Sequence, residues 1–220
     1  MESRKEKYER LNLTDGLKLC GHYDIPEIKP VSITGIPQLI PFGDAAAEKL
    51  PDQKGVHFFI DDYRFLRLWN APVKYTGLLK KFRCVFSPDF SLYTDYPRAM
   101  QIYNHYRKHV LAAYWQNEGV TVVPTISWST RDSFDWCFDG EPCGGTVAIS
   151  SVGTQASAES KQLFLDGYFE MLKRLRPETV IFYGSVPSEC EGNIIPVGAF
   201  QDKFKEVRIN GRQRRKQRQE

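Results

Sequence analysis

From residue 55 onward, short unbroken apolar runs alternate with longer amphipathic stretches. Runs rich in β-branched and aromatic residues predict strands, here over 55–60, 84–87, 120–127, 145–151 and 179–184. Helical spacing predicts helices over 96–118 and 157–176, and two short helices in 64–82, where Pro72 interrupts the pattern. Unbroken apolar runs are typical of parallel strands that are covered on both faces. The pattern therefore predicts an α/β fold with a mainly parallel sheet built from alternating βα units.

The order of these elements is compatible with two architectures. A TIM-barrel-like arrangement would need further strands, which the first 54 residues and residues 193–198 would supply. An open doubly wound sheet is the alternative. We favour the barrel-like arrangement. Inside the third run, Pro124 either weakens the strand or marks a bulge, and Asp95 and Ser157 are predicted helix N-caps.

Turn-forming residues divide the chain into three parts. Residues 1–54 contain five Pro and four Gly, which predicts an irregular leader packed on the body, with a short helix near 44–50. Residues 55–200 are predicted to form a single α/β domain, whose size one hydrophobic core can support. Residues 201–220 form a basic tail that we expect to be flexible.

Charge is distributed unevenly along the chain. The net charge is +3, but residues 203–220 contain eight Lys or Arg and two Glu, a net +6, which leaves −3 on the remainder. Basic tails of this kind bind nucleic acid or another anionic surface, although a solvated terminus is the simpler explanation. The candidate nucleic-acid contacts in the tail are Arg212, Arg214, Arg215, Lys216 and Arg218.

Composition excludes several classes of protein. With 41% hydrophobic and 26% charged residues, the chain is globular rather than disordered. No apolar run reaches the ~18 residues of a membrane span, so no membrane partner is expected. The N-terminal sequence MESRKEKYER lacks the apolar centre of a secretory signal, and the five cysteines are scattered, which together predict a cytoplasmic protein.

Polar residues or glycines follow every apolar run. Because the carboxyl ends of parallel strands meet on one rim, where α/β proteins bind ligands, these residues predict a pocket. Caps and turns use the same residue types, so any single Asp or Ser among them is more simply explained by local structure. The candidate ligand-binding residues are Arg64, Ser87, Tyr93, Trp128, Ser129, Ser151, Gly153, Tyr183 and Gly184.

Three kinds of chemistry suit this rim. Asp61, Asp62 and Asp89 are the candidate catalytic residues, because close carboxylates separate into an acid and a base, or alternatively hold Mg²⁺. The stretch SSVGT suits a phosphate group bound at the start of the following helix. Aromatic residues such as Trp128 suit a stacked base or sugar.

These options lead to three functional hypotheses. The first is an enzyme, such as a hydrolase, acting on a phosphate-bearing substrate, either a nucleotide or a nucleic acid. The second is a module that binds a nucleotide, a nucleic acid or a host protein without turnover. The third is a glycosidase-like barrel hydrolase, in which Asp135 and Asp139 would be the carboxylate pair.

The histidines match no metal-binding motif. His105 and His109 share a helix face, but no Glu lies between them as in HExxH, which predicts a surface pair. His57 lies inside the first apolar run, away from its carboxyl end, which predicts a structural role.

Several long motifs occur in one order along the chain: FFIDDYRF, FSPDFSLY, VPTISW, SFDWCFDG and VAISSVG. From about residue 32 to 184 the chain resembles a family known as domain of unknown function 4417. The resemblance implies a protein of phages, plasmids or other mobile elements in bacteria, and it implies no particular activity. The family signature falls here on Asp61, Asp62, Arg64, Ser87, Asp89, Tyr93, Trp128, Ser129, Asp135, Asp139, Gly140, Ser151, Gly153, Gly167, Tyr183 and Gly184.

Overall fold

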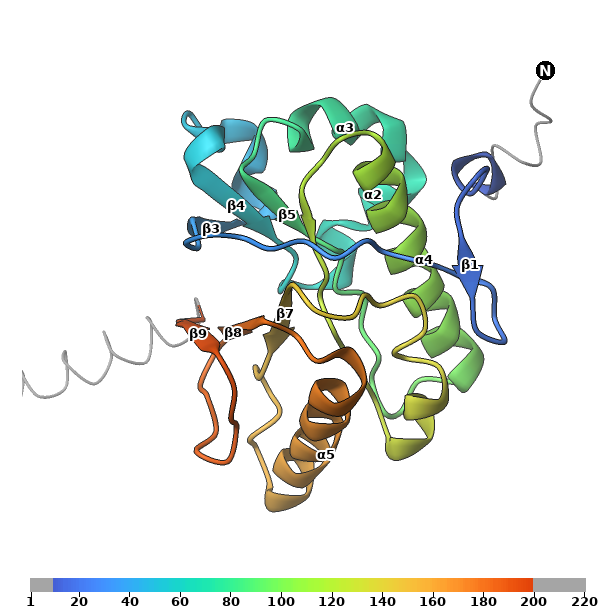
Figure 1. Ribbon diagram of the computed structural model, residues 1–220. Helices are drawn as coiled ribbons and strands as arrows, with labels where there is room; N and C mark the ends of the chain where they lie inside the picture. The colour runs from blue at the N-terminus through green and yellow to red at the C-terminus, as the bar shows by residue number, and fades with distance from the viewer. Residues whose placement is uncertain (1–9, 200–220) are drawn as a thin grey trace, which may run out of the picture.

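The computed structural model describes residues 10–199 and confirms an α/β architecture with parallel sheets (Figure 1). One sheet has the strand order β3-β4-β5-β6 and the other has the order β7-β8-β9, and all neighbouring strands in both are parallel. The strands are β3 (Gln38–Pro41), β4 (Lys54–His57), β5 (Cys84–Phe86), β6 (Val122–Val123), β7 (Thr146–Ser150), β8 (Thr179–Tyr183) and β9 (Ile194–Val197). A separate antiparallel hairpin consists of β1 (Leu19–Cys20) and β2 (Ile25–Pro26).

Helices connect most of the successive strands. In Figure 1, α2, α3 and α4 lie beside the four-stranded sheet, and α5 lies beside the three-stranded sheet. The α-helices are α2 (Leu66–Asn70), α3 (Pro72–Leu79), α4 (Arg98–Asn117) and α5 (Ala158–Leu175). Short 3₁₀ helices are η1 (Leu11–Leu13), η2 (Phe42–Ala47), η3 (Pro51–Gln53), η4 (Asp62–Arg64) and η5 (Arg131–Asp135). The prediction of two helices separated at Pro72 is confirmed, because Pro72 begins α3.

One isolated bridge joins the two sheets within residues 10–199. Thr125 pairs with Ala148, whose N–H donates to Pro124 O at 2.8 Å, while Ile126 N–H donates to Ala148 O at 2.8 Å. Because Pro124 has no N–H to continue the ladder, the strand predicted over 120–127 is reduced to β6 and this bridge. The strands therefore follow one another in chain order from β3 to β9, without the reversal of a doubly wound sheet.

The sheets curve toward each other. The Tyr183 ring at the end of β8 lies 4.9 Å from the His57 ring at the end of β4 and 4.8 Å from the Phe59 ring, measured between ring centroids. Strands far apart in the sheet order thus bring their side chains together. Among the described strands, β3 pairs only with β4 and β9 only with β8, so these residues form no closed barrel.

The first predicted strand ends earlier than its apolar run. The run was expected to be extended over 55–60, but β4 stops at His57. The N–H of Ile60 then donates to Phe58 O at 2.7 Å, which closes a tight three-residue turn. This turn packs Phe58 into the core and places His57, rather than Ile60, at the carboxyl end of the strand.

The N-cap predicted at Ser157 is confirmed, and the N-cap predicted at Asp95 is wrong. Ser157 Oγ accepts the N–H of Ser160 at 3.0 Å. The helix α4 instead begins after Pro97, and the side chain of Gln101 holds the preceding turn by donating to Tyr93 O and Tyr96 O. A glutamine one turn inside the helix therefore fixes its start, which a search for capping residues does not find.

Two hydrophobic clusters form the core. The first packs α2, α3 and α4 against the four-stranded sheet and also includes Ala148 and Ile181 of the other sheet. The second packs α5 and the segment around Trp136 against the three-stranded sheet. The edge strand β3 lies in the part of the chain expected to be an irregular leader, and it pairs with β4 over its whole length.

No helix within residues 10–199 is both long and apolar enough to cross a membrane. The predicted nucleic-acid contacts of the tail lie outside the described residues and stay predictions. They are Arg212, Arg214, Arg215, Lys216 and Arg218.

Candidate functional site

A pocket of about 710 Å³ lies along the seam between β3 and β9, and we call it the seam pocket. Residues of both edge strands line it, together with the segment that follows β4 and the end of β8. Ligand pockets in proteins commonly enclose about 300–1,000 Å³ and combine apolar walls with a few polar groups. The polar residues that line the seam pocket are Gln38, Asp44, His57, Asp61, Arg64 and Tyr183.

His57 presents a hydrogen-bond donor in the seam pocket. Its Nδ1 accepts the N–H of Phe59 at 3.2 Å, so the proton of the neutral ring lies on Nε2. Burial lowers the pKa of His57 to about 4, because the charged imidazolium loses its solvation, and the ring is therefore neutral at pH 7. A structural role is predicted for this residue because it lies inside the apolar run, but the turn after β4 places it at the end of the strand instead.

Asp61 and Arg64 lie at the two ends of the turn that includes η4. The N–H of Arg64 donates to Asp61 O at 3.0 Å, and this turn holds both residues beside the seam pocket. Both side chains are exposed, and within residues 10–199 neither forms a hydrogen bond or ion pair through its charged group. A carboxylate and a guanidinium are therefore both available to a ligand.

The three predicted catalytic carboxylates do not converge on one site. Asp61 lines the seam pocket, whereas Asp62 and Asp89 do not. The carboxylate of Asp62 accepts the N–H of Ser91 at 3.1 Å and its Oγ–H at 2.8 Å, so it fixes the loop after β5. Asp61 and Asp62 are adjacent in the chain, yet the first lines the seam pocket and the carboxylate of the second contacts Ser91.

Asp89 is a half-buried carboxyl with no hydrogen-bond or ion-pair partner in the described part of the chain. Burial raises its pKa to about 7; the Lys108 ammonium opposes this shift and the Asp62 carboxylate adds to it. The folded protein therefore binds more protons than the unfolded chain between about pH 4 and pH 7, so its stability falls as the pH rises through this range.

We expect Asp89→Asn to raise the free energy of unfolding at pH 8 by about 1–3 kcal/mol, because the amide carries no charge to desolvate. At pH 4 the two proteins should differ little. Urea denaturation at several pH values measures this difference. The matched control is Asp52→Asn, at an exposed carboxylate, with an effect of about 0.5 kcal/mol or less. A variant that is less stable than the wild type at pH 8 would contradict the prediction.

Two of the predicted rim serines hold strands together. The Oγ of Ser87 is fully buried and accepts the N–H of Thr125 at 2.7 Å. Ser151 Oγ–H donates to Ser185 O at 2.8 Å, and Ser151 N–H donates to Tyr183 O at 3.0 Å. In these positions they join the ends of neighbouring strands, and neither lines the seam pocket.

Trp128 packs against the outer helix α5. Its ring lies 5.4 Å from the Phe164 ring, and a Cβ added at Gly167 would overlap the indole, which explains the glycine there. Beside it, Ser129 Oγ is buried and has no partner within residues 10–199. Tyr93 is 58% exposed and its ring packs on Tyr96. None of the three predicted ligand-binding residues lines the seam pocket.

The glycines predicted to bind phosphate have different environments. Gly184 has φ +106°, and a Cβ there would lie 2.7 Å from Ser151 Oγ, so close packing requires the glycine. Gly153 has φ +81° with no atom within 4 Å of an added Cβ, so only its backbone conformation favours glycine. Tyr183 is 6% exposed and is the one of these strand-end residues that lines the seam pocket.

The histidines of α4 are not a surface pair. His105 is 1% exposed and His109 is 0% exposed, because the segment around Gly140 packs over this face of the helix. Of the carboxylates proposed for a glycosidase-like site, Asp135 is exposed and Asp139 is half-buried, and neither lines the seam pocket.

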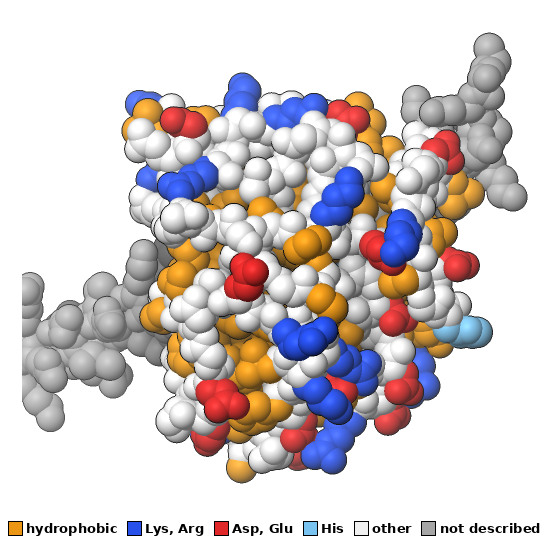
Figure 2. Space-filling view, viewed as in Figure 1, with side chains coloured by type: hydrophobic (Ala, Val, Ile, Leu, Met, Phe, Trp, Pro, Cys, Tyr) orange, Lys and Arg blue, Asp and Glu red, His pale blue; other side chains and the backbone are white. Residues whose placement is uncertain are grey.

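Charged side chains of both signs are interspersed on the face shown in Figure 2. Several of the arginines form ion pairs within the body, such as Arg98 with Asp132 at 3.0 Å and Arg131 with Asp166 at 2.7 Å. This face therefore carries no extended patch of one sign of the kind that binds a nucleic-acid backbone.

The fold and the seam pocket define an α/β protein with a pocket at the ends of parallel strands. The chain belongs to the family described as "Domain of unknown function (DUF4417)", which matches residues 17–201. It is 37% identical over 198 residues to the "Gene 1 protein" of Mycobacterium phage L5, covering 86% of this chain and 83% of that protein. It is 38% identical over 186 residues to the "Gene 1 protein" of Mycobacterium phage D29, covering 81% of this chain and 66% of that protein. No solved structure is significantly similar.

Proposed function

We propose that the seam pocket binds a phosphate-bearing small molecule such as a nucleotide, and that the chain acts in a phage or another mobile element. The observation that carries this proposal is the guanidinium of Arg64, which lines the pocket without an ion-pair partner in the described residues. Arginine recognises phosphate through charge-assisted, often paired hydrogen bonds. The neutral His57 ring adds an Nε2–H donor for a second anionic oxygen.

The apolar wall of the seam pocket favours a ligand that also carries a ring. Phe59 and Tyr183 stack on each other at 4.8 Å, and both line the pocket. The edge strands β3 and β9 add Leu39 and Val197 to the same wall. A base or another flat group has apolar and aromatic surface to contact here, while its phosphate reaches Arg64.

The enzyme hypothesis rests on Asp61 and His57. Asp61 is a carboxylate in the pocket that could activate water, and the His57 Nε2–H could stabilise charge that develops on the substrate. A Mg²⁺ ion held by Asp61 together with Asp62 and Asp89 has less support, because those two carboxylates lie outside the pocket. The remaining carboxylate of the pocket is the exposed Asp44.

The sequential strand order and the curvature of the two sheets support an open, TIM-barrel-like arrangement, in which β3 and β9 border the seam. In such an arrangement the pocket would occupy the place where a closed barrel has its last pair of strands. A ligand that contacts both edge strands would then stabilise the fold by linking its two sheets.

The test is calorimetric titration of the full chain with nucleoside mono-, di- and triphosphates, with and without Mg²⁺. We expect Arg64→Gln to weaken binding about 10–100-fold, the effect of one lost charge-assisted hydrogen-bonded contact. The matched control is Arg98→Gln, which removes an exposed arginine outside the pocket and should leave the affinity unchanged. Equal affinities for the wild type and Arg64→Gln, or no binding by the wild type, would refute the proposal.

Turnover of the bound nucleotide distinguishes the enzyme from the binding module. Asp61→Asn should retain most of the affinity and lose at least about 100-fold in rate if the carboxylate acts as a general base. If the wild type binds a nucleotide and releases it unchanged, the pocket belongs to a non-catalytic binding module.

A further inference from the structure

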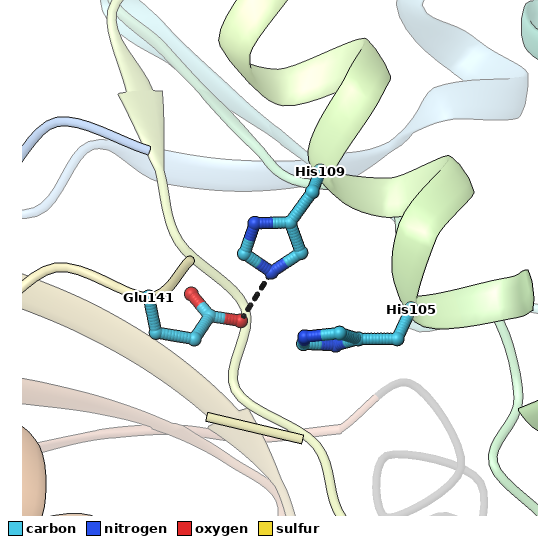
Figure 3. A group of neighbouring side chains, drawn as sticks. All are labelled: His105, His109 and Glu141. Atoms are coloured by element: carbon cyan, nitrogen blue, oxygen red, sulfur yellow. Dashed lines mark hydrogen bonds and ion pairs between the residues drawn. The ribbon is translucent and has the colours of Figure 1, made fainter. Parts of the chain in front are cut away.

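Three buried side chains outside the seam pocket face one another. His105 and His109 project from successive turns of α4, and Glu141 lies in the segment between η5 and β7. One ring nitrogen of each histidine and one carboxylate oxygen of Glu141 lie within 4.8 Å of one another. Figure 3 shows the two rings and the carboxylate turned toward a common centre. Histidine and glutamate are ligands for transition-metal ions.

Each histidine uses one ring nitrogen to contact a backbone carbonyl. His105 Nε2 lies 2.9 Å from Asp139 O, and His109 Nδ1 lies 2.7 Å from Pro26 O. A carbonyl oxygen only accepts hydrogen bonds, so these two nitrogens carry the protons. In neutral rings, His105 Nδ1 and His109 Nε2 are then lone-pair acceptors. Metal-bound histidines are oriented in the same way, by donating their other N–H to a carbonyl or carboxylate.

The cluster has more acceptors than donors. His109 Nε2 lies 3.1 Å from Glu141 Oε1, a contact between two acceptors if both groups carry no extra proton. His105 Nδ1 and Glu141 Oε2 are buried and have no hydrogen-bond partner within the described residues. The Lys108 ammonium donates to Glu141 Oε1 at 2.5 Å, and within residues 10–199 no hydrogen bond reaches the other two acceptor atoms. Buried polar atoms are nearly always paired, so these acceptors lack an electron-pair acceptor such as a second cation in addition to Lys108.

We propose that His105, His109 and Glu141 form a binding site for one divalent transition-metal ion, with Zn²⁺ as the ion that best fits this ligand set. Two imidazole nitrogens and a carboxylate oxygen suit Zn²⁺, whereas Mg²⁺ and Ca²⁺ require oxygen ligands. Metal–ligand bonds of about 2.0–2.2 Å place the ligands of a tetrahedral ion about 3.4 Å apart, so the three side chains must approach one another on binding.

The site would be structural rather than catalytic, because its ligands are buried and none lines the seam pocket. An ion here would join α4 to the segment that contains Glu141. Through the hydrogen bond of His109 to Pro26 O, it would also join the β1–β2 hairpin. The helix α4, the segment with Glu141 and the β1–β2 hairpin do not share a β-sheet. A metal ion would therefore add stability between elements that no sheet hydrogen bonds connect.

Lys108 competes with the metal for Glu141. Its ammonium contacts Oε1, while Oε2 has no partner within residues 10–199, so an ion bound through Oε2 would lie close to a second positive charge. Removing that charge should strengthen metal binding. We therefore expect Lys108→Met to bind Zn²⁺ more tightly than the wild type, and Zn²⁺ to raise the Tm of this variant by more than it raises the Tm of the wild type.

The experiment is a titration of the chelator-treated full chain with Co²⁺ and then Zn²⁺. We expect one equivalent of Co²⁺ per chain, with the visible absorption of a four- or five-coordinate ion, displaced by Zn²⁺. Glu141→Gln should weaken binding at least about 10-fold. His22→Ala, which removes an exposed histidine outside the cluster, is the matched control and should bind like the wild type.

A second measurement needs no variant. In ¹⁵N NMR spectra of the wild type, the chemical shifts of the ring nitrogens of His105 and His109 differ between a neutral, a protonated and a metal-bound ring. Zn²⁺-dependent shifts of one nitrogen in each ring would support the site. Two outcomes would overturn the proposal. In the first, neither the wild type nor Lys108→Met binds metal, and His109 carries a proton on both ring nitrogens. In the second, metal binds, but Glu141→Gln leaves the affinity unchanged.

Discussion

Replacing Lys108 by Met is expected to lower the free energy of unfolding by about 3–5 kcal/mol at pH 7.5, the cost of breaking a buried ion pair from one side. Lys108 is 1% exposed, and its ammonium donates to Glu141 Oε1 at 2.5 Å and to Thr125 O at 3.0 Å. Burial alone would raise the pKa of Glu141, but Lys108 and His109 hold it below its usual value. Without the ammonium, the carboxylate stays buried and loses its main counter-charge.

Urea denaturation without added metal measures this loss of stability. Two further variants test whether the loss comes from the unpaired, buried carboxylate of Glu141. Lys80→Met removes an ammonium of similar reach from the ion pair with Glu118, in which both side chains are 43% exposed. That change should cost about 1 kcal/mol or less, because water already screens the pair. The double variant Lys108→Met with Glu141→Gln should recover part of the loss, because no unpaired charge remains. A loss below about 1 kcal/mol in Lys108→Met would show that the pair does not stabilise the fold.

Replacing Gly140 by Ala is expected to destabilise the protein by about 3 kcal/mol. Gly140 has φ +75°, a conformation that costs a residue with a Cβ about 1–2 kcal/mol. The added Cβ would also lie 2.6 Å from both His109 Nδ1 and Pro26 O. Backbone and a buried ring cannot move aside as a flexible side chain does, so overpacking should add about 1–3 kcal/mol. The same displacement would break the hydrogen bond of His109 to Pro26.

Gly153→Ala separates the two parts of this cost. Gly153 has a similar φ of +81°, but no atom lies within 4 Å of an added Cβ. Its substitution should therefore cost about 1 kcal/mol, the conformational part alone. Thermal and urea denaturation of both variants provide the comparison. Equal effects at the two positions would mean that the contact of Gly140 with α4 and β2 is looser than the structure indicates.

The positions of the regular elements were largely predictable, because they depend on local patterns. Apolar runs identified β5, β7 and β8 within one or two residues, and helical spacing identified α4 and α5. Residues 193–198, which contain β9, were expected to form a strand only in the barrel-like arrangement. Pro72 and Pro124 were read correctly as interruptions, since a missing N–H acts within the chain neighbourhood of the proline. The edge strand β3 was harder to place, because its residues lie among turn formers.

The composition of the site was not predictable in the same way. Asp61 and Asp62 are neighbours in sequence, yet one lines the seam pocket and the other holds Ser91. His57 reaches the pocket because a tight turn ends β4 early, and its tautomer depends on the N–H of Phe59. Each of these outcomes depends on the direction of a side chain at a strand end, which a pattern of residue types does not specify.

By itself, the sequence determined that this protein is an α/β protein with parallel strands and a member of its family. It also determined that polar residues follow the strands. Local hydrophobic periodicity and turn chemistry suffice for that much. The tertiary structure alone decided which residues share a pocket, and that His105 and His109 are buried beside Glu141. The physical reason is that burial and hydrogen-bond pairing arise from contacts between segments distant in the chain, so they emerge only when the sheets curve and the loops pack.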